Sequence, residues 1–531
     1  MPDGRGIFKV SSSERQVVGA LGSIGAATLA SRVLGFVRDM IVALAFGAGP
    51  VTDAFFVAFR IPNILRRLLA EGALSTAVIP VFTDYAVARP REELVRMLRA
   101  VLAAALLVLI ATTVAGIVAA PWIVTFIAPG FGADPAQRDL AVQLTRVMFP
   151  YLVLVGLAAF AMGVLNSQGR FFAAALGPAV LNVGMIAAVL MLAARVDPPI
   201  VALALGVLVG GVGQLLVQIP TLRNVGLLVP PSRELGHPAL GRVARLLLPA
   251  VFGLAAVQVM VFVNTLLASL LPAGSISFLY YADRVMEFPL GIFGIALASA
   301  ALPAMSRQAA AGDTRGVAGT VSFALRLAAY VSVPATVGLV VLSVPTTRVL
   351  FERGRFGAAD TEATAVALVW YALGLVGFAG SRITAQAFYA VSEPATAVKL
   401  GVLSIVANLV AAMALMGPMG HAGLAAASSV GAYVNLAGLL WAARRRFGPL
   451  GGRAMAQSVA RTGLACIPLL AWCLVSLRLA DAMPLHTTAR LAGWLAVTIG
   501  IGAGVFWGAS ALVGSSERVA LLGMLPSRRS R

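Results

Sequence analysis

The stretches SRVLGFVRD (residues 31–39) and TDAFFVAFRIPNILRRLLAEGALSTAVIP (residues 52–80) carry charges inside apolar sequence long enough to cross a bilayer. The eight charged residues are Arg32, Arg38, Asp39, Asp53, Arg60, Arg66, Arg67 and Glu71. A charge at the centre of a membrane helix costs ~3 kcal/mol, so eight lipid-facing charges would cost roughly 20 kcal/mol. Folded proteins have a net stability of only about 5–15 kcal/mol. Some of these charges are therefore expected to face a polar cavity or to lie near helix ends. Charged residues inside membrane spans are candidates for a functional site.

The composition of the whole chain is that of a polytopic helical membrane protein. Of its 531 residues, 60% are hydrophobic and 11% are charged, whereas soluble proteins have about 25% charged residues. The mean hydropathy is +0.93. The apolar runs are long and continuous, which is not the alternating pattern of a transmembrane β-barrel. We therefore expect an all-α membrane protein.

At about 20 residues per span, the apolar runs predict about fourteen transmembrane helices. Their approximate positions are 17–47, 52–82, 94–128, 140–165, 172–194, 198–220, 242–271, 276–308, 318–350, 362–390, 396–416, 420–442, 456–478 and 488–513. Arginines gather in the loops after the second, sixth and twelfth spans, while the loops at 271–277 and 417–423 contain neither Arg nor Lys. Cytoplasmic loops carry the excess of positive residues, so both termini are expected in the cytoplasm.

The sequence repeats itself at an offset of 224 residues. FFVAFR (55–60) aligns with LYYADR (279–284), and Pro121 aligns with Pro345. Chance similarity between apolar helices is the alternative, but coincident prolines and an arginine favour a true duplication. Two six-span repeats share one orientation and are related by a two-fold axis along the membrane normal. We therefore expect a lobe at 1–225, a second lobe at 226–450, and two extra helices with a cytoplasmic tail at 451–531.

Other residue patterns exclude several classes of function. The formal net charge is +19, but the basic residues are dispersed among the spans, so a nucleic-acid partner is not expected. The three histidines are scattered, and no metal-ligand spacing or nucleotide-binding loop is present. Cys466 and Cys473 lie two turns apart in one apolar segment, too far to form a disulfide within a helix. They are expected to be packing residues.

Four segments of the chain resemble the MurJ/MviN family. They are SRVLGFVRD, TDAFFVAFRIPN, YYADRVMEFP at 280–289 and HAGLA at 421–425. Members are lipid II flippases of the multidrug/oligosaccharidyl-lipid/polysaccharide exporter superfamily. The resemblance implies a two-lobed core of twelve helices plus two C-terminal helices that form a groove for a lipid tail. The implied partner is lipid II, a polyprenyl diphosphate that carries a disaccharide pentapeptide.

The resemblance also assigns site residues one by one. The family's cavity arginines match Arg32, Arg38, Arg66 and Arg284, and two of its acids match Asp39 and Asp53. Asp283 and Glu287 lie on either side of Arg284 along the chain. Arginine binds phosphate through paired N–H groups and stays charged in a cavity, so the four arginines are expected to bind substrate. The four acids are expected to tune or gate them, or to form ion pairs between helices.

The predicted function is translocation of lipid II from the inner to the outer leaflet of the bacterial plasma membrane by alternating access. Alternatives are export of another polyprenyl-diphosphate-linked glycan or of drugs, a membrane-embedded glycan-processing enzyme, and a scaffold in a cell-wall synthesis complex. The short extracytoplasmic loops disfavour an enzyme, and the excess of arginine disfavours an exporter of organic cations.

No cofactor is expected. An ion gradient, the membrane potential or removal of the product would then drive transport. Some family members have a sodium site in the second lobe, but its acidic ligands have no match here. The seventh span offers Gln258 and Asn264 and no carboxylate.

Overall fold

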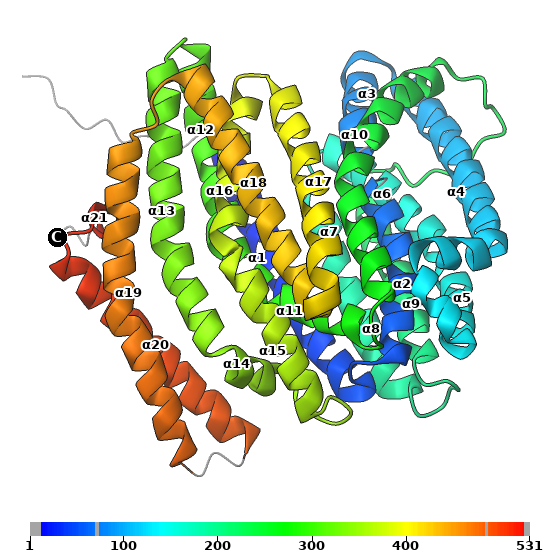
Figure 1. Ribbon diagram of the computed structural model, residues 1–531. Helices are drawn as coiled ribbons and strands as arrows, with labels where there is room; N and C mark the ends of the chain where they lie inside the picture. The colour runs from blue at the N-terminus through cyan, green and yellow to red at the C-terminus, as the bar shows by residue number, and fades with distance from the viewer. Residues whose placement is uncertain (1–11, 69–73, 484–486, 525–531) are drawn as a thin grey trace, which may run out of the picture. The chain divides into compact units, whose positions relative to one another are not determined.

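The computed structural model describes residues 12–68, 74–483 and 487–524, and every regular element in these ranges is a helix (Figure 1). The expectation of an all-α polytopic protein is confirmed. Glu71 and the arginines of the C-terminal SRRSR sequence (527–531) lie outside the described residues.

The chain divides into two compact units. The first comprises the chain up to Phe46 and Pro50–Leu266, and the second comprises Gly47–Gly49 and the chain from Leu267 onward. The first unit contains α1 (Ser12–Phe46), α2 (Pro50–Arg66), α3 (Leu74–Ala88), α4 (Arg91–Ile127), a 3₁₀ helix (Pro129–Ala133), α5 (Pro135–Met148), α6 (Tyr151–Ser167), α7 (Phe172–Ala175), α8 (Gly177–Leu192), α9 (Val201–Asn224) and nearly all of α10 (Pro238–Ser269).

The second unit contains two helices with a π-helical link, followed by nine further helices. These are α11 (Ser275–Pro289), the π-helical segment Leu290–Ile295, α12 (Ala296–Ala310), α13 (Thr314–Val341), α14 (Ser343–Phe351), α15 (Ala358–Leu373), α16 (Leu375–Ala390), α17 (Pro394–Met419), α18 (His421–Phe447), α19 (Gly452–Asp481), α20 (Thr488–Leu512) and α21 (Ser516–Met524).

Nine spans within the described residues are long and apolar enough to cross a membrane, and α15 with α16, bent by 42°, forms a tenth. The other four predicted spans correspond to α1, to α2 with α3, to α10, and to α11 with α12. Helices α1, α2 and α11 are the ones that carry the charges of the candidate site. The total of fourteen spans stays a prediction.

Local sequence explains where several helices begin, bend or end. Asp134 caps α5 by accepting bonds from two backbone amides of its first turn, and Pro135 occupies the first helical position. Pro62 and Pro289 lie inside long apolar segments, where proline is expected to break or bend the helix. At Pro289 this is confirmed, since a π-helical segment follows that residue. Pro62 does not end its helix, because α2 continues through it to Arg66.

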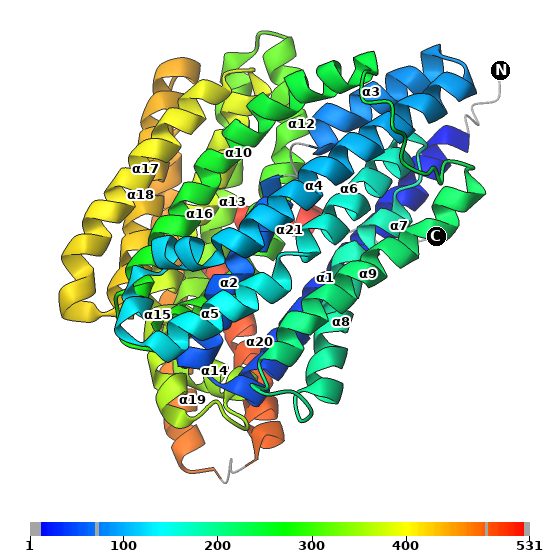
Figure 2. The same cartoon turned by 90° about the vertical axis from the view of Figure 1, so that its right-hand side faces the viewer.

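Both units contain helix pairs that pack tightly at glycine residues. In the first unit α8 lies against α9 (Figure 2), and a Cβ atom on Gly184 would lie 2.6 Å from the Cα of Gly210. In the second unit α17 lies against α18, where a Cβ on Gly431 would lie 3.0 Å from the Cβ of Asn408. Small residues allow membrane helices to approach this closely.

The C-terminal hairpin of α19 and α20 packs against α13 within the second unit (Figure 1). Tyr330 of α13 is 2% exposed, and its hydroxyl lies 2.8 Å from the hydroxyl of Ser510 in α20. Cys466 and Cys473 are free thiols buried in the same apolar cluster, so their predicted role in packing is confirmed.

Candidate functional site

Arg38 is buried inside the first unit and is bonded on two sides. Its Nε and Nη2 donate to Oδ1 of Asp39 at 3.0 and 2.6 Å, and its Nη1 donates to Oδ1 of Asn182 at 2.9 Å. Arg38 is 8% exposed and Asp39 is 2% exposed. Both charges are thus paired and removed from lipid, as the energetic argument from the sequence required.

Asn182 belongs to α8 and contacts one face of α1. Besides accepting from Arg38, its amide nitrogen donates to the carbonyl oxygen of Ser31 at 3.1 Å. Ser31, Gly35 and Arg38 recur at helical spacing and share that face. A Cβ on Gly35 would lie 3.4 Å from the amide nitrogen of Asn182, so the glycine allows the amide to approach. Asn182 was not among the residues predicted from the sequence, although a polar residue in an apolar span is the relevant signal.

Asp53 and Arg32 have opposite environments. Asp53 lies in the first turn of α2 and is 2% exposed. A carboxylate in that position is stabilised by the partial positive charge of the helix N-terminus. Arg32 is exposed on α1, so its side chain, unlike that of Arg38, is accessible in this conformation.

Arg66 closes α2 and bonds to its own helix. Its Nε and Nη2 both donate to Oδ1 of Asn63, at 3.0 and 2.9 Å, and the residue is half-buried. Arg67 is exposed. The two adjacent arginines therefore differ in environment, which their order in the sequence does not reveal.

Arg60 connects α2 to α10 within the first unit. Its Nη1 donates to the carbonyl oxygen of Val261 at 3.2 Å and to the hydroxyl of Thr265 at 2.6 Å. Thr265 is 1% exposed. This contact was not predictable from the sequence, because the partners are about 200 residues apart.

In the second unit, Arg284 forms a group with residues of its own helix, α11. Its Nη1 donates to Glu287 at 2.9 Å, its Nη2 donates to the hydroxyl of Tyr280 at 3.1 Å, and the guanidinium carbon lies 5.0 Å from the centre of the Tyr280 ring. Arg284 and Asp283 are half-buried, whereas Glu287 is exposed. The acid beside Arg284 is thus Glu287, one turn further along α11.

The candidate residues are divided between the two units. Arg32, Arg38, Asp39, Asp53 and Arg66 belong to the first unit, and Asp283, Arg284 and Glu287 belong to the second. Within its unit the structure brings Arg38 together with Asp39, and Arg284 together with Glu287. In both pairs a guanidinium that could bind an anion already has a carboxylate partner.

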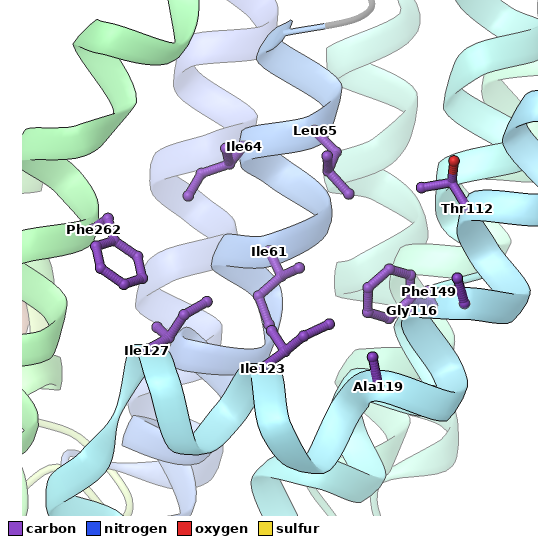
Figure 3. A pocket seen from close by; sticks show the side chains of 11 residues that line it. Ile61, Ile64, Leu65, Thr112, Gly116, Ala119, Ile123, Ile127, Phe149 and Phe262 are labelled. Atoms are coloured by element: carbon purple, nitrogen blue, oxygen red, sulfur yellow. The ribbon is translucent and has the colours of Figure 1, made fainter.

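The first unit also contains an apolar cavity of about 450 Å³, shown in Figure 3. Helix α2 contributes Ile61, Ile64 and Leu65, and the opposite sides come from α4, Phe149 and Phe262. Thr112 is the one lining residue with a polar side chain. Such a surface suits hydrocarbon and carries no charged side chain for an anionic group, so the charged site and this cavity are chemically distinct.

Comparison with known proteins identifies a family that matches most of the chain. The sequence model of the family described as Lipid II flippase MurJ matches residues 42–490. Lipid II flippase MurJ of Burkholderia cenocepacia is 37% identical over 501 residues, which cover 92% of this chain and 96% of that protein. The probable lipid II flippase MurJ of Vibrio cholerae is 38% identical over 439 residues, 81% of this chain and 83% of that protein.

Solved structures show the same fold. A lipid II flippase MurJ in an inward closed conformation matches with a TM-score of 0.78 and 23% identity, covering 92% of this chain and 98% of that one. An inward-facing multidrug resistance MATE family transporter of the MOP superfamily matches with a TM-score of 0.65 and 18% identity. That alignment covers 80% of this chain and 96% of the transporter.

Proposed function

Because the chain belongs to the lipid II flippase MurJ family, we propose that it moves lipid II from the inner to the outer leaflet of the membrane. It is a multi-pass transporter and not an enzyme. The observation that carries this proposal is the 37% identity to a lipid II flippase over nearly the full length of both chains. The recognition of the family from SRVLGFVRD and TDAFFVAFRIPN is thereby confirmed.

We infer that Arg32, Arg38, Arg66 and Arg284 bind the diphosphate of lipid II. A diphosphate offers several acceptor oxygens, and guanidinium groups bind such oxygens through paired, charge-assisted bonds. Arg32 is accessible, and Arg66 and Arg284 are half-buried, which supports contact with a ligand. Arg38 is buried, so its contact with substrate requires the side chain to leave its present partners.

We propose that four acids act as charge partners of these arginines and gate their access to substrate. They are Asp39, Asp53, Asp283 and Glu287. The bonds of Asp39 to Arg38 and of Glu287 to Arg284 support this role for two of the four. An acid that pairs with an arginine keeps a buried charge from being unpaired. When the anionic headgroup binds, it replaces the carboxylate as the partner.

We propose that residues 1–225 and 226–450 act as two lobes that rock to open the cavity first inward and then outward. The repeat at an offset of 224 residues and the fold shared with MATE family transporters support this. Residues 451–531 would hold the lipid tail on the hairpin of α19 and α20. Transport would be driven by an ion gradient, the membrane potential or removal of the product.

We also propose that the protein lies in the bacterial plasma membrane with both termini in the cytoplasm, where it serves a cell-wall synthesis complex. The arginine-rich loops support this orientation. A cysteine introduced at Gly417 should react with a membrane-impermeant thiol reagent added outside intact spheroplasts. Labelling of that cysteine only after lysis would contradict the orientation.

The function is tested by complementation of a bacterium depleted of its own flippase. Expression of this chain should restore growth and make lipid II accessible to an enzyme added at the outer face of the membrane. If a stably expressed chain restored neither, the proposal would be wrong. Export of a different polyprenyl-diphosphate glycan without lipid II would identify the alternative transporter class.

A further inference from the structure

We propose that Asn182 is a positioning residue for Arg38, which it holds against α8 in the substrate-free protein and must release before the diphosphate can bind. This inference rests on the proposed function and adds a residue of α8 to the substrate site. The Asn182 amide and the Asp39 carboxylate accept from the N–H groups of Arg38 that phosphate oxygens would use.

The guanidinium of Arg38 is not available to a ligand in its present hydrogen-bonded arrangement. Three of its nitrogen atoms donate to Asp39 and Asn182 at 2.6–3.0 Å, and the side chain is 9% exposed. Phosphate oxygens would use the same N–H groups. Binding of a diphosphate to Arg38 therefore requires an exchange of partners.

Asp39 and Asn182 are not equivalent as partners of Arg38. Asp39 is the next residue of α1 and moves with Arg38, whereas Asn182 belongs to α8. Among the partners of Arg38 described above, only Asn182 ties the guanidinium to a different helix. The bond to Asn182 therefore has to break before Arg38 can leave α8.

The side-chain amide of Asn182 is fixed by hydrogen bonds at both its nitrogen and its oxygen. Its nitrogen donates to the carbonyl oxygen of Ser31 at 3.1 Å, and its oxygen accepts from Arg38 at 2.9 Å. Asn182 is 6% exposed and lies over Gly35. One amide therefore spans two turns of α1, and its oxygen points at Arg38 because its nitrogen is already bonded.

The strength of the acceptor at position 182 should set the affinity for substrate. In Asn182→Asp, a carboxylate acceptor binds a guanidinium roughly twice as strongly as a neutral one and should hold Arg38 more tightly. In Asn182→Leu, a side chain of similar volume offers no acceptor and should free the guanidinium. A net hydrogen bond of ordinary strength corresponds to about a five-fold change in binding.

The test uses the full-length protein in nanodiscs, titrated with fluorescent lipid II. Asn182→Asp should weaken binding by about five-fold, and Asn182→Leu should tighten it by about five-fold. A residue with a purely structural role would shift both variants in the same direction. The melting temperature of each variant is measured in parallel and shows whether that variant is folded. If one variant is not folded, the other still tests the predicted direction of the change in affinity.

The chain offers a matched control in Asn408, a buried asparagine of α17 that is 1% exposed and whose amide nitrogen donates to Ser428. Asn408→Asp should leave the affinity for lipid II unchanged within two-fold. Equal shifts in Asn182→Asp and Asn408→Asp, or shifts of one sign in both Asn182 variants, would overturn the role of Asn182. Absence of lipid II binding by the wild-type protein would instead overturn the proposed function.

Discussion

Arg60 illustrates how a charged side chain is accommodated between membrane helices. Its guanidinium donates to the carbonyl oxygen of Val261 and to the hydroxyl of Thr265, and Thr265 itself donates to the carbonyl of Val261 at 2.6 Å. Inside a bilayer, polar groups must find partners within the protein. Arg60 therefore fastens the C-terminal half of α10 to α2.

Replacement of Arg60 by Ala should destabilise the protein by about 1.5–3 kcal/mol, the range for hydrogen bonds made by a charged donor. The measurement is unfolding in detergent followed by intrinsic fluorescence. Arg67→Ala serves as the control, because Arg67 is exposed one residue past the end of α2. Equal stability losses in the two variants would show that the contact of Arg60 with α10 contributes nothing.

At the level of single residues, the sequence identified the unusual charges but not their partners. The cost of charge in a bilayer was enough to select Arg38, Asp39 and Asp53, which are all buried. Helical spacing places Arg32 and Asp39 on one face, yet Arg32 is exposed and Asp39 is not. Spacing gives the face of a helix, whereas the contacts depend on which helix packs against it.

The pair of α8 and α9 shows at the level of elements how glycine determines helix packing. A Cβ added to Gly184 would lie 2.6 Å from both the Cα and the backbone nitrogen of Gly210. These are backbone atoms, which cannot rotate away as a side chain could. Any residue larger than glycine must therefore push the two helices apart.

We expect Gly184→Ala to destabilise the protein by about 1–3 kcal/mol, the usual range for overpacking. Gly401 of α17 is the matched control, since a Cβ there would meet nothing within 4 Å. Gly401→Ala should be neutral or stabilising by about 0.5–1 kcal/mol, because alanine favours a helix. Thermal unfolding of both variants measures the difference, and a Gly184→Ala protein as stable as wild type would contradict the packing argument.

An ion pair beyond the C-terminal end of the α19–α20 hairpin connects α21 to α13 within the second unit. Arg326 of α13 donates to Glu517 of α21 at 3.0 Å, and Glu517 is 2% exposed. Burial by itself would raise the pKa of Glu517. Bonds from its own backbone amide and from the hydroxyls of Ser516 and Ser515 outweigh burial, so the pKa of Glu517 lies below its ordinary value of 4.5.

A lowered pKa means that the carboxylate of Glu517 stabilises the folded state above pH 4.5 and ceases to do so as the pH falls through the folded-state pKa. A spin label on Val519→Cys, an exposed position of α21, should therefore be more mobile at pH 3 than at pH 7. Glu517→Gln should be mobile already at pH 7. The same mobility in both proteins at both pH values would show that the ion pair does not hold α21.

Element boundaries were only partly predictable from the sequence. Pro289 was a correct signal, because the helix widens into a π-helical segment directly after it. At Pro62 the helix does not end, because α2 continues through it to Arg66. A proline removes one backbone donor, but neighbouring helices decide whether the chain then bends, and the local sequence does not contain them.

At the level of the whole molecule, the sequence predicted the class of fold and the family, and both are confirmed. The family was recognised from the sequence segments that contain Arg32, Asp53 and Arg284. The division at residue 225 stays a prediction, because the compact units of the structure separate near Leu266 by packing. A duplication would place the boundary between the lobes by sequence, whereas the compact units are defined by which helices pack together, so the two boundaries need not coincide.

The central claim is that arginines from both units bind the diphosphate of lipid II. The most direct measurement is lipid II translocation in proteoliposomes containing wild type, Arg38→Ala, Arg284→Ala or Arg146→Ala, where Arg146 is an exposed arginine of α5. Arg38→Ala and Arg284→Ala should each lose at least about ten-fold in rate, since loss of one charge-assisted contact removes about 1.5–3 kcal/mol. Arg146→Ala should retain the wild-type rate. Wild-type rates in correctly folded Arg38→Ala and Arg284→Ala proteins would contradict the account.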